Sequence, residues 1–221
     1  MNETQAFMTK VYGWMSAGLF TTAAVAMLTV STPQMIHFIV TNSIIFFVLL
    51  IAELAAVAYL SLAIKKMSAA TATITFLLYA VLNGLTFSIL FLVYTSNSIA
   101  LTFGVTAGMF GIMSVYGYVT KSDLTKAGNF AFMGLIGIIL GSLANIFFRN
   151  VAFYWVITYI GIVVFVILTA SDTQKIKQMN VLGNAGTEED QKESIMGALT
   201  LYLDFINLFL LLLRILGRRR K

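Results

Sequence analysis

The 221-residue sequence contains no cysteine, one histidine and one proline, and only 10% of its residues are charged. Without cysteine the chain has no disulfides, thiolate zinc sites or cysteine nucleophiles, and a single histidine excludes a multi-histidine metal site within one chain. A soluble domain carries about 25% charged residues. The composition therefore excludes a soluble globular domain, a disordered chain and a nucleic-acid-binding module, and we expect no nucleic-acid partner.

Hydrophobic residues make up 59% of the chain and fall into long runs. A helix needs about 20 mainly apolar residues to cross about 30 Å of hydrocarbon. Six runs meet this requirement, at residues 11–30, 43–64, 70–94, 99–119, 130–148 and 151–170. A seventh, 197–217, carries Asp204 and Arg214. The sequence predicts an all-α polytopic membrane protein, in which residues 1–221 form a single integral membrane domain with a polar inner loop at 171–196 and a basic tail at 218–221.

The distribution of lysine and arginine predicts how the chain crosses the membrane. Eight lysines lie in the N-terminal segment and in the connections after the second, fourth and sixth runs, whereas the opposite connections contain only Arg149. We therefore expect a cytoplasmic N-terminus. If 197–217 spans fully, the four basic residues of the tail lie outside, and eight lysine and arginine residues are on the inner side against five on the outer side. If it is re-entrant, twelve are on the inner side and one is on the outer side. Charge favours the re-entrant segment and length favours the full span, so both stay open.

Glycines in two of the runs have the spacing of helix-packing motifs. Gly104 and Gly108 are four residues apart, as are Gly137 and Gly141, and Gly134 extends the second pair. Small residues at this spacing allow two membrane helices to approach closely. We expect both pairs to lie at helix–helix contacts.

Several charged residues lie inside the predicted spans, where each costs at least about 2.5–3.5 kcal/mol on insertion scales and normally has a partner or a function. In the last run Asp204, Asn207 and Arg214 share one helical face, which predicts a helix at the centre of a bundle because lipid offers no hydrogen bonds. Arg214 lies about 15 Å from Asp204 along the helix. Its expected partner is Glu53, the mid-span carboxylate of the second run, in a structural ion pair.

Asp172 and Asp204 are then left without obvious cationic partners. Two carboxyl groups in a poorly solvated site cannot both ionise cheaply, so a close pair would share one proton. Loss of the proton would leave a doubly negative site that attracts a hard cation such as Ca²⁺ transiently, with no permanent metal. Alternatively, Asp172 flanks a helix start, since Ser171 and Gln174 have capping-box spacing, and Asp204 is neutral and hydrogen-bonded to Asn207 or to a threonine.

Three other polar residues are candidates for a role in the pathway or at the membrane interface. Asn83 lies in the middle of a span, where we expect it to hydrogen-bond across helices, with a role in lining a pathway as the alternative. Lys65 and Lys66 end the second span and are expected to extend to the inner interface.

Five segments carry a resemblance to a known family: VYGWM, LNGLTFSILFLVYT, TAGMFGIMSVYGYVTKSDL, TYIGIVVFVILTASDTQKIK and ALTLYLDFINLFLLLLRILG. They resemble the transmembrane Bax inhibitor motif family, also called the Bax inhibitor-1-like or lifeguard family, and in particular its bacterial inner-membrane members. The resemblance covers nearly the whole chain. It implies a seven-helix bundle, with six helices around a central C-terminal helix, and a pH-sensitive Ca²⁺ leak.

The resemblance also implies roles for particular residues. Asp172 and Asp204 correspond to a hydrogen-bonded pH-sensor pair, and Glu53 and Arg214 to a structural ion pair. Lys65 or Lys66 occupies the place of a basic latch that closes the pore.

The leading hypothesis is a pH-sensitive calcium leak channel of the bacterial inner membrane. Asp172 and Asp204 would sense pH and line the ion pathway, with Asn207 and Asn83 as a supporting polar face and Ca²⁺ as the permeant ion. The alternative is a non-conducting regulator whose loop 171–194 and basic tail bind a membrane protease or another membrane protein. No enzyme is expected, because G-x-S-x-G and H-E-x-x-H are absent, and no cofactor is expected. A proton-coupled carrier is disfavoured because no repeat-related pair of broken helices is visible.

Overall fold

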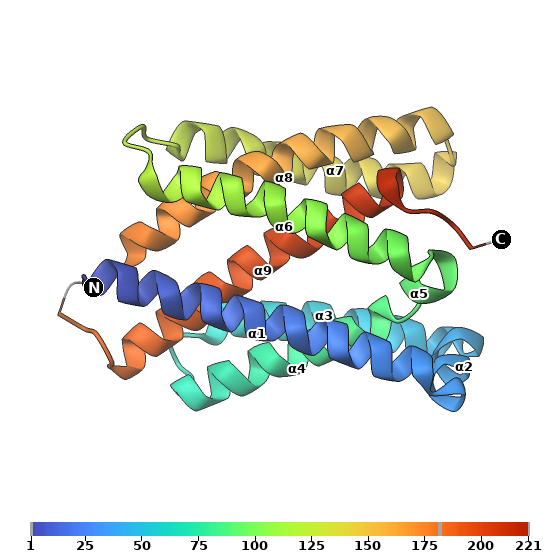
Figure 1. Ribbon diagram of the computed structural model, residues 1–221, viewed down its shortest axis with the longest axis horizontal. Helices are drawn as coiled ribbons and strands as arrows, with labels where there is room; N and C mark the ends of the chain where they lie inside the picture. The colour runs from blue at the N-terminus through green and yellow to red at the C-terminus, as the bar shows by residue number, and fades with distance from the viewer. Residues whose placement is uncertain (1, 181–182, 221) are drawn as a thin grey trace. The chain divides into compact units, whose positions relative to one another are not determined.

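The computed structural model describes residues 2–180 and 183–220, and the described chain is built from α-helices (Figure 1). Within these residues, seven helical segments are long and apolar enough to cross a membrane. They are α1 (Glu3–Ser31), α3 (Ser43–Ala63), α4 (Ala69–Phe87) together with the short α5 (Leu90–Val93), α6 (Ser96–Val119), α7 (Thr125–Phe148), α8 (Val151–Met179) and α9 (Glu188–Leu216). The predicted all-α polytopic membrane fold is confirmed. A short helix, α2 (Pro33–Thr41), occupies the polar break after α1.

Side chains at the helix starts explain several of the boundaries. Asn2 and Gln5 form a capping box at the start of α1, with the Asn2 side chain accepting from the Gln5 amide at 2.8 Å. The Ser68 hydroxyl accepts from the Thr71 amide at the start of α4. These bonds satisfy amide groups that have no partner within the helix.

The chain divides into two compact units. Unit 1 comprises Met1–Thr95, Met179–Tyr202 and Arg219–Lys221, and unit 2 comprises Ser96–Gln178 and Leu203–Arg218. Helix α9 therefore supplies its first half to unit 1 and its second half to unit 2.

In unit 1, α4 packs against both α1 and α3, and the first half of α9 completes the core. The ring of Tyr202 lies edge-on to the rings of Phe76 and Tyr79, with centroids 5.9 and 5.7 Å apart. Its hydroxyl is 2.7 Å from the Thr22 hydroxyl, which also bonds to the Ala80 carbonyl. Aromatic packing and a buried hydrogen bond thus join α1, α4 and α9.

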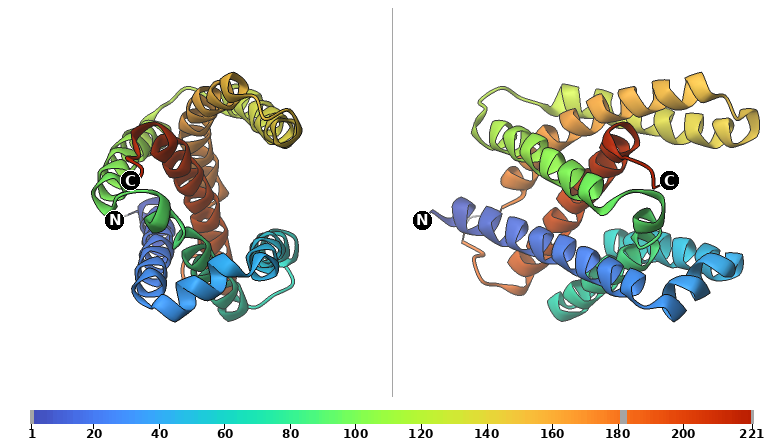
Figure 2. Two further views of the ribbon diagram at one scale, coloured as in Figure 1. Left: turned by 90° about the vertical axis from the view of Figure 1, so that its right-hand side faces the viewer. Right: turned by 45° about the vertical axis from the view of Figure 1, so that its right-hand side comes forward.

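In unit 2, α7 and α8 form a hairpin and lie side by side in both views of Figure 2. Arg149 ends α7 in the left-handed conformation, with φ 49°. The second half of α9 packs Leu208 and Leu211 into a buried cluster with Phe165 and Leu168 of α8. Since lipid tails are as apolar as these side chains, close packing and not water exclusion favours the contact.

Helix α9 differs from the other spans in its burial. In its most apolar stretch 72% of residues are buried, against 33% or less in each of the other spans. Only 6% are buried in α3 and α7, whose exposed leucine, isoleucine and phenylalanine side chains suit a lipid-facing surface. The polar face of the last apolar run correctly predicted a helix surrounded by protein.

The length and continuity of α9 favour a full span over a re-entrant segment. Helix α9 is unbroken over 29 residues, a length of about 43 Å, and a re-entrant segment would need a break. Within unit 1 the tail then pairs with the end of α5: Arg219 forms an antiparallel bridge with Tyr94, and the Arg220 amide donates to the Val93 carbonyl at 2.9 Å. The span Ala69–Val93 separates these residues from Lys65 and Lys66. These features favour the full span, which stays a prediction because α9 is a candidate span by length and composition.

The polar loop expected at 171–196 is shorter in the structure. Helix α8 continues through the SDTQKIK segment to Met179, and α9 begins at Glu188. Polar residues at the ends of long membrane helices were interpreted as a loop because the search for spans followed hydrophobicity alone.

The glycine prediction was right for two of the residues and wrong for three. A Cβ on Gly134 would lie 2.8 Å from Val164, and one on Gly141 would touch Ile157. Among the described residues, no side chain and no other segment lies within 4 Å of where a Cβ would stand on Gly104, Gly108 or Gly137. Close approaches also occur at other glycines: a Cβ on Gly84 would lie 2.6 Å from the Val25 Cβ. Four-residue spacing shows which face the glycines share but not whether another helix covers that face.

Candidate functional site: the acidic segment of helices α8 and α9

The two aspartates singled out by the sequence both lie in unit 2, Asp172 on α8 and Asp204 on α9. Their carboxyl groups are close enough to influence each other electrostatically, and Lys175 acts on the same site. Among the described residues no hydrogen bond joins the two carboxyl groups. The hydrogen-bonded form of the pair implied by the family resemblance is therefore not observed.

Asp204 is the more enclosed of the two aspartates. The residue is 4% exposed, and its Oδ2 atom is buried without a hydrogen-bond partner among the described residues. Its neighbour in sequence, Phe205, packs against Phe103 and Phe110 of α6, with ring centroids 5.1 and 5.5 Å away. Burying a carboxylate without a partner costs several kcal/mol, so this position is unfavourable for a permanently ionised group.

Asp172 has a cationic partner that the sequence interpretation missed. Its Oδ1 atom accepts from the Lys175 ammonium at 2.9 Å, and the two side chains are 16% and 46% exposed. The expectation that Asp172 lacks such a partner was wrong. Side chains three residues apart are neighbours on a helix, and the segment had been interpreted as the start of a loop.

The rest of the SDTQ segment anchors α8 to α6 and to the α6–α7 connection. The Thr173 and Ser114 hydroxyls are 3.1 Å apart and buried. The Gln174 side chain accepts from the Leu124 amide and donates to the Ser122 carbonyl, each at 2.9 Å. These contacts replace the predicted capping box, which was wrong because α8 does not begin here.

Glycines allow α8 to approach its neighbours closely at this level. A Cβ on Gly117 of α6 would collide with the Ala170 carbonyl, and one on Gly128 of α7 with the Ser171 hydroxyl. Ser171 is buried, and its hydroxyl has no partner among the described residues. Asp172 therefore stands on a tightly held part of α8.

The two asparagines proposed as a supporting polar face bond within their own helices. Asn207 donates to the Leu203 carbonyl at 2.8 Å, and the buried Asn83 donates to the Tyr79 carbonyl at 3.0 Å. The expected bond from Asn83 across helices is not observed. Asn83 belongs to unit 1 and Asn207 to unit 2, so a joint role in one pathway stays a prediction.

Glu53 and Arg214 each have a partner within their own unit. The Glu53 carboxylate in unit 1 accepts a hydrogen bond from the Thr86 hydroxyl. The Arg214 guanidinium in unit 2 lies over the Tyr154 ring, 5.0 Å from its centroid. The predicted ion pair would join the two units, and it stays a prediction.

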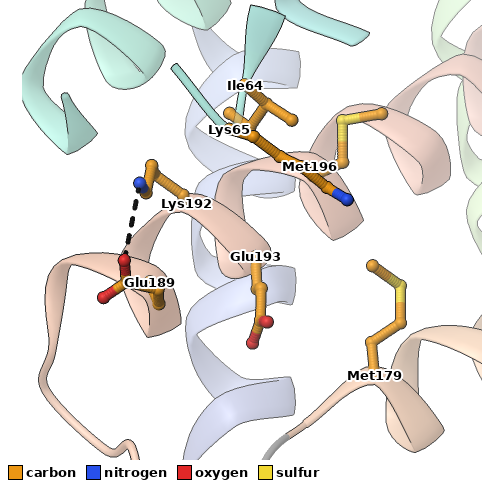
Figure 3. A pocket seen from close by; sticks show the side chains of 7 residues that line it. All are labelled: Ile64, Lys65, Met179, Glu189, Lys192, Glu193 and Met196. Carbon is orange, nitrogen blue, oxygen red and sulfur yellow. Dashed lines mark ion pairs between the residues drawn. The ribbon is translucent and has the colours of Figure 1, made fainter. Parts of the chain in front are cut away.

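Lys65 and Lys66 follow the end of α3, and both are exposed. Lys65 lines a pocket in unit 1 with residues from the first turns of α9 (Figure 3). The role of either lysine as a latch that closes the pore also stays a prediction.

The acidic start of α9 is held by contacts within unit 1. The Glu188 carboxylate accepts from the Ala69 amide at the start of α4, at 2.9 Å. The buried Asp190 forms an ion pair with Lys10 of α1 and accepts from the Gly186 amide. These side chains thus fasten α9 to α1 and α4.

No group of three or more potential metal ligands from histidine, cysteine, aspartate and glutamate is found within the described part of the chain. Asp172 and Asp204 contribute carboxylate oxygens only, the ligand type that suits Ca²⁺, which usually takes six to eight oxygen ligands. Water or substrate oxygens would have to complete any such coordination, as in a transient site.

These features define a class of protein: an all-α polytopic membrane protein that carries two neighbouring carboxyl groups on its last two helices. Comparison with known proteins identifies the family within this class. The family model described as "Inhibitor of apoptosis-promoting Bax1" matches residues 4–221. The chain belongs to this family, and the resemblance proposed from its motifs is confirmed.

The chain is also similar over nearly its whole length to several bacterial proteins. It is 54% identical over 217 residues to the inner membrane protein YbhL of Escherichia coli strain K12, covering 98% of this chain and 93% of YbhL. It is 46% identical over 214 residues to an uncharacterized protein of Borreliella burgdorferi, covering 97% and 92%. Together with seven apolar helices, the YbhL match supports a multi-pass location in the inner membrane.

Proposed function

We propose that this protein is a pH-sensitive calcium leak channel of the inner membrane, gated by a proton shared between Asp172 and Asp204. The observation that carries the proposal is the Asp204 carboxyl group, which is 4% exposed, has one oxygen without a partner and lies within electrostatic range of a second carboxyl group. An ionisable group kept inside a membrane helix at such a cost is normally functional.

In the proposed gate, the net charge of the Asp172–Asp204–Lys175 site controls whether α8 and α9 stay packed together. With a proton bound to the pair, the nearby Lys175 ammonium balances the one remaining negative charge, and α8 and α9 stay packed through Leu168 and Leu208. When the proton leaves, two carboxylates face one ammonium, so the site carries a net negative charge and the two aspartates repel each other. The separated carboxylates then offer oxygen ligands to Ca²⁺. No catalytic step or resident cofactor is involved.

The proposed orientation places this sensor near the cytoplasm. With a cytoplasmic N-terminus, the ends of α3, α6 and α8 that carry most lysines face inward, as the positive-inside rule favours. Asp172 lies seven residues before the end of α8, so the pair would respond to cytoplasmic pH. The tail bound beside Tyr94 would then lie on the outer face.

The test is Ca²⁺ flux into vesicles that contain the purified protein and a Ca²⁺-sensitive dye, measured between pH 5 and 8. We expect Asp172→Asn and Asp204→Asn to abolish the pH dependence. Asp123→Asn is the matched control, because Asp123 is exposed in the α6–α7 connection of the same unit. If both site variants keep the flux and pH profile of the unaltered protein, the gate does not exist.

The alternative, a non-conducting regulator, depends on surfaces that could hold a partner protein. Glu188 and Asp190 already bond to Ala69 and Lys10 within unit 1. The third acidic side chain of this cluster, Glu189, is 70% exposed and forms one loose ion pair, at 3.8 Å, with Lys192. Pull-down from inner membranes that is lost in Glu189→Gln, beside vesicles that show no flux for any variant, would support this alternative.

A further inference from the structure

A pocket of about 350 Å³ opens in unit 1 at the ends of three membrane helices (Figure 3). It is lined by Ile64, Lys65, Met179, Glu189, Lys192, Glu193 and Met196. Ile64 and Lys65 directly follow α3, and Met179 is the last residue of α8. The remaining lining residues lie in the first turns of α9. Its volume is within the range of about 300–1,000 Å³ that small-molecule sites occupy. Because helix ends lie where hydrocarbon gives way to headgroups, a phospholipid can reach this pocket.

The lining combines an apolar part with a charged part of zero net charge. Ile64, Met179 and Met196 form the apolar part. The charged part contains two ammonium groups, of Lys65 and Lys192, and two carboxylates, of Glu189 and Glu193. This composition is unlike a purely anion-binding site, in which cations predominate.

One cation and one anion of the pocket are available to a ligand. Lys192 and Glu189 lie 3.8 Å apart, and Figure 3 shows the Lys192 side chain turned toward Glu189. Lys65 has no ion-pair partner among the described residues, and the Glu193 carboxylate receives only a 3.5 Å hydrogen bond from the Asn184 amide.

We propose that this pocket binds a zwitterionic phospholipid with a primary ammonium headgroup, of the phosphoethanolamine class. The phosphate contacts the Lys65 ammonium, the headgroup ammonium donates to the Glu193 carboxylate, and an acyl chain covers the two methionines. An anionic headgroup without an ammonium would face Glu193 with like charge. A trimethylammonium headgroup has no N–H to donate to that carboxylate.

The experiment is native mass spectrometry of the full chain in detergent, with equal concentrations of dioleoyl phosphatidylethanolamine, phosphatidylglycerol and phosphatidylcholine. We expect phosphatidylethanolamine to be retained in preference to the other two. Lys65→Met should lower its retention about fivefold, the loss expected for one exposed ion pair worth about 1 kcal/mol. Glu193→Gln should reduce the preference over phosphatidylcholine, because a neutral amide oxygen accepts a weaker hydrogen bond from the headgroup ammonium than a carboxylate does.

Lys66→Met is the matched control, because Lys66 is the adjacent exposed lysine and does not line the pocket. It should leave lipid retention unchanged. Since Lys65 is also exposed, its replacement by methionine is not expected to prevent folding. Equal retention of the three lipids, a preference for phosphatidylglycerol, or equal effects of Lys65→Met and Lys66→Met would each overturn the proposal. Lipid retention is read without measuring flux, so the outcome does not depend on the leak proposed above.

Discussion

The ion pair between Lys175 and Asp172 gives a quantitative test of the gate. Replacing Lys175 by methionine removes the only cation found within 4 Å of this carboxylate among the described residues. The ammonium favours the ionised form of the pair, so its loss makes the shared proton harder to remove. The pH at which Ca²⁺ flux is half-maximal should therefore move upward.

The size of the shift follows from the exposure of the pair. Lys175 is 46% exposed, and ion pairs of this kind contribute about 0.2–1 kcal/mol. Since 1.36 kcal/mol corresponds to about one pH unit, the flux midpoint should rise by about 0.1–0.7 pH unit.

Vesicle flux at closely spaced pH values, in low salt to limit screening, measures this shift. Lys175→Arg keeps the charge and should keep the midpoint, and Lys121→Met should not change it because Lys121 is an exposed loop residue without an ion pair among the described residues. An unchanged midpoint in Lys175→Met, or a downward shift, would refute the electrostatic reasoning.

Three further predictions concern stability and topology. Gly84→Ala should lower the midpoint of thermal unfolding in detergent, since overpacking costs about 1–3 kcal/mol and the new Cβ would meet α1; Gly104→Ala should raise it by about 2–4 °C through helix propensity, and a decrease there would show that a partner covers this face. Tyr202→Phe should cost about 1 kcal/mol in the same assay by removing one buried hydrogen bond, and an unchanged midpoint would contradict it. Because the chain has no cysteine, a single introduced cysteine is the only site that a maleimide can label. A membrane-impermeant maleimide should label Arg219→Cys from outside intact cells and Lys121→Cys only after the membrane is opened. The reverse labelling pattern would contradict the proposed orientation.

The number and positions of the spans could be predicted from the sequence because hydrophobic length is a local property. A run of about 20 apolar residues is predicted to form a helix in lipid, because a helix satisfies its backbone hydrogen bonds within the segment. Helix ends were less predictable. The polar turns that extend α8 to Met179 and begin α9 at Glu188 are helical, and hydrophobicity carries no signal for them.

The candidate site was predicted in part. Asp172 and Asp204 could be found because an unpaired acid in a span is costly. Lys175 could have been found from its i, i+3 spacing if α8 had been extended. The roles of Ser114, Gln174 and Ser122 depend on contacts across 50 or more residues of sequence, for which a single sequence provides no spacing rule.

The sequence by itself determined the class of fold, the seven spans and the acidic residues, because the cost of polar groups in hydrocarbon depends on composition and helical period alone. Only the tertiary structure decided which glycines lie at close contacts, that Asp172 is paired while one Asp204 oxygen is not, and that the tail returns to Val93 and Tyr94 at the end of α5. These features depend on which helix covers which face, and that is set by the packing of side chains distant in the sequence.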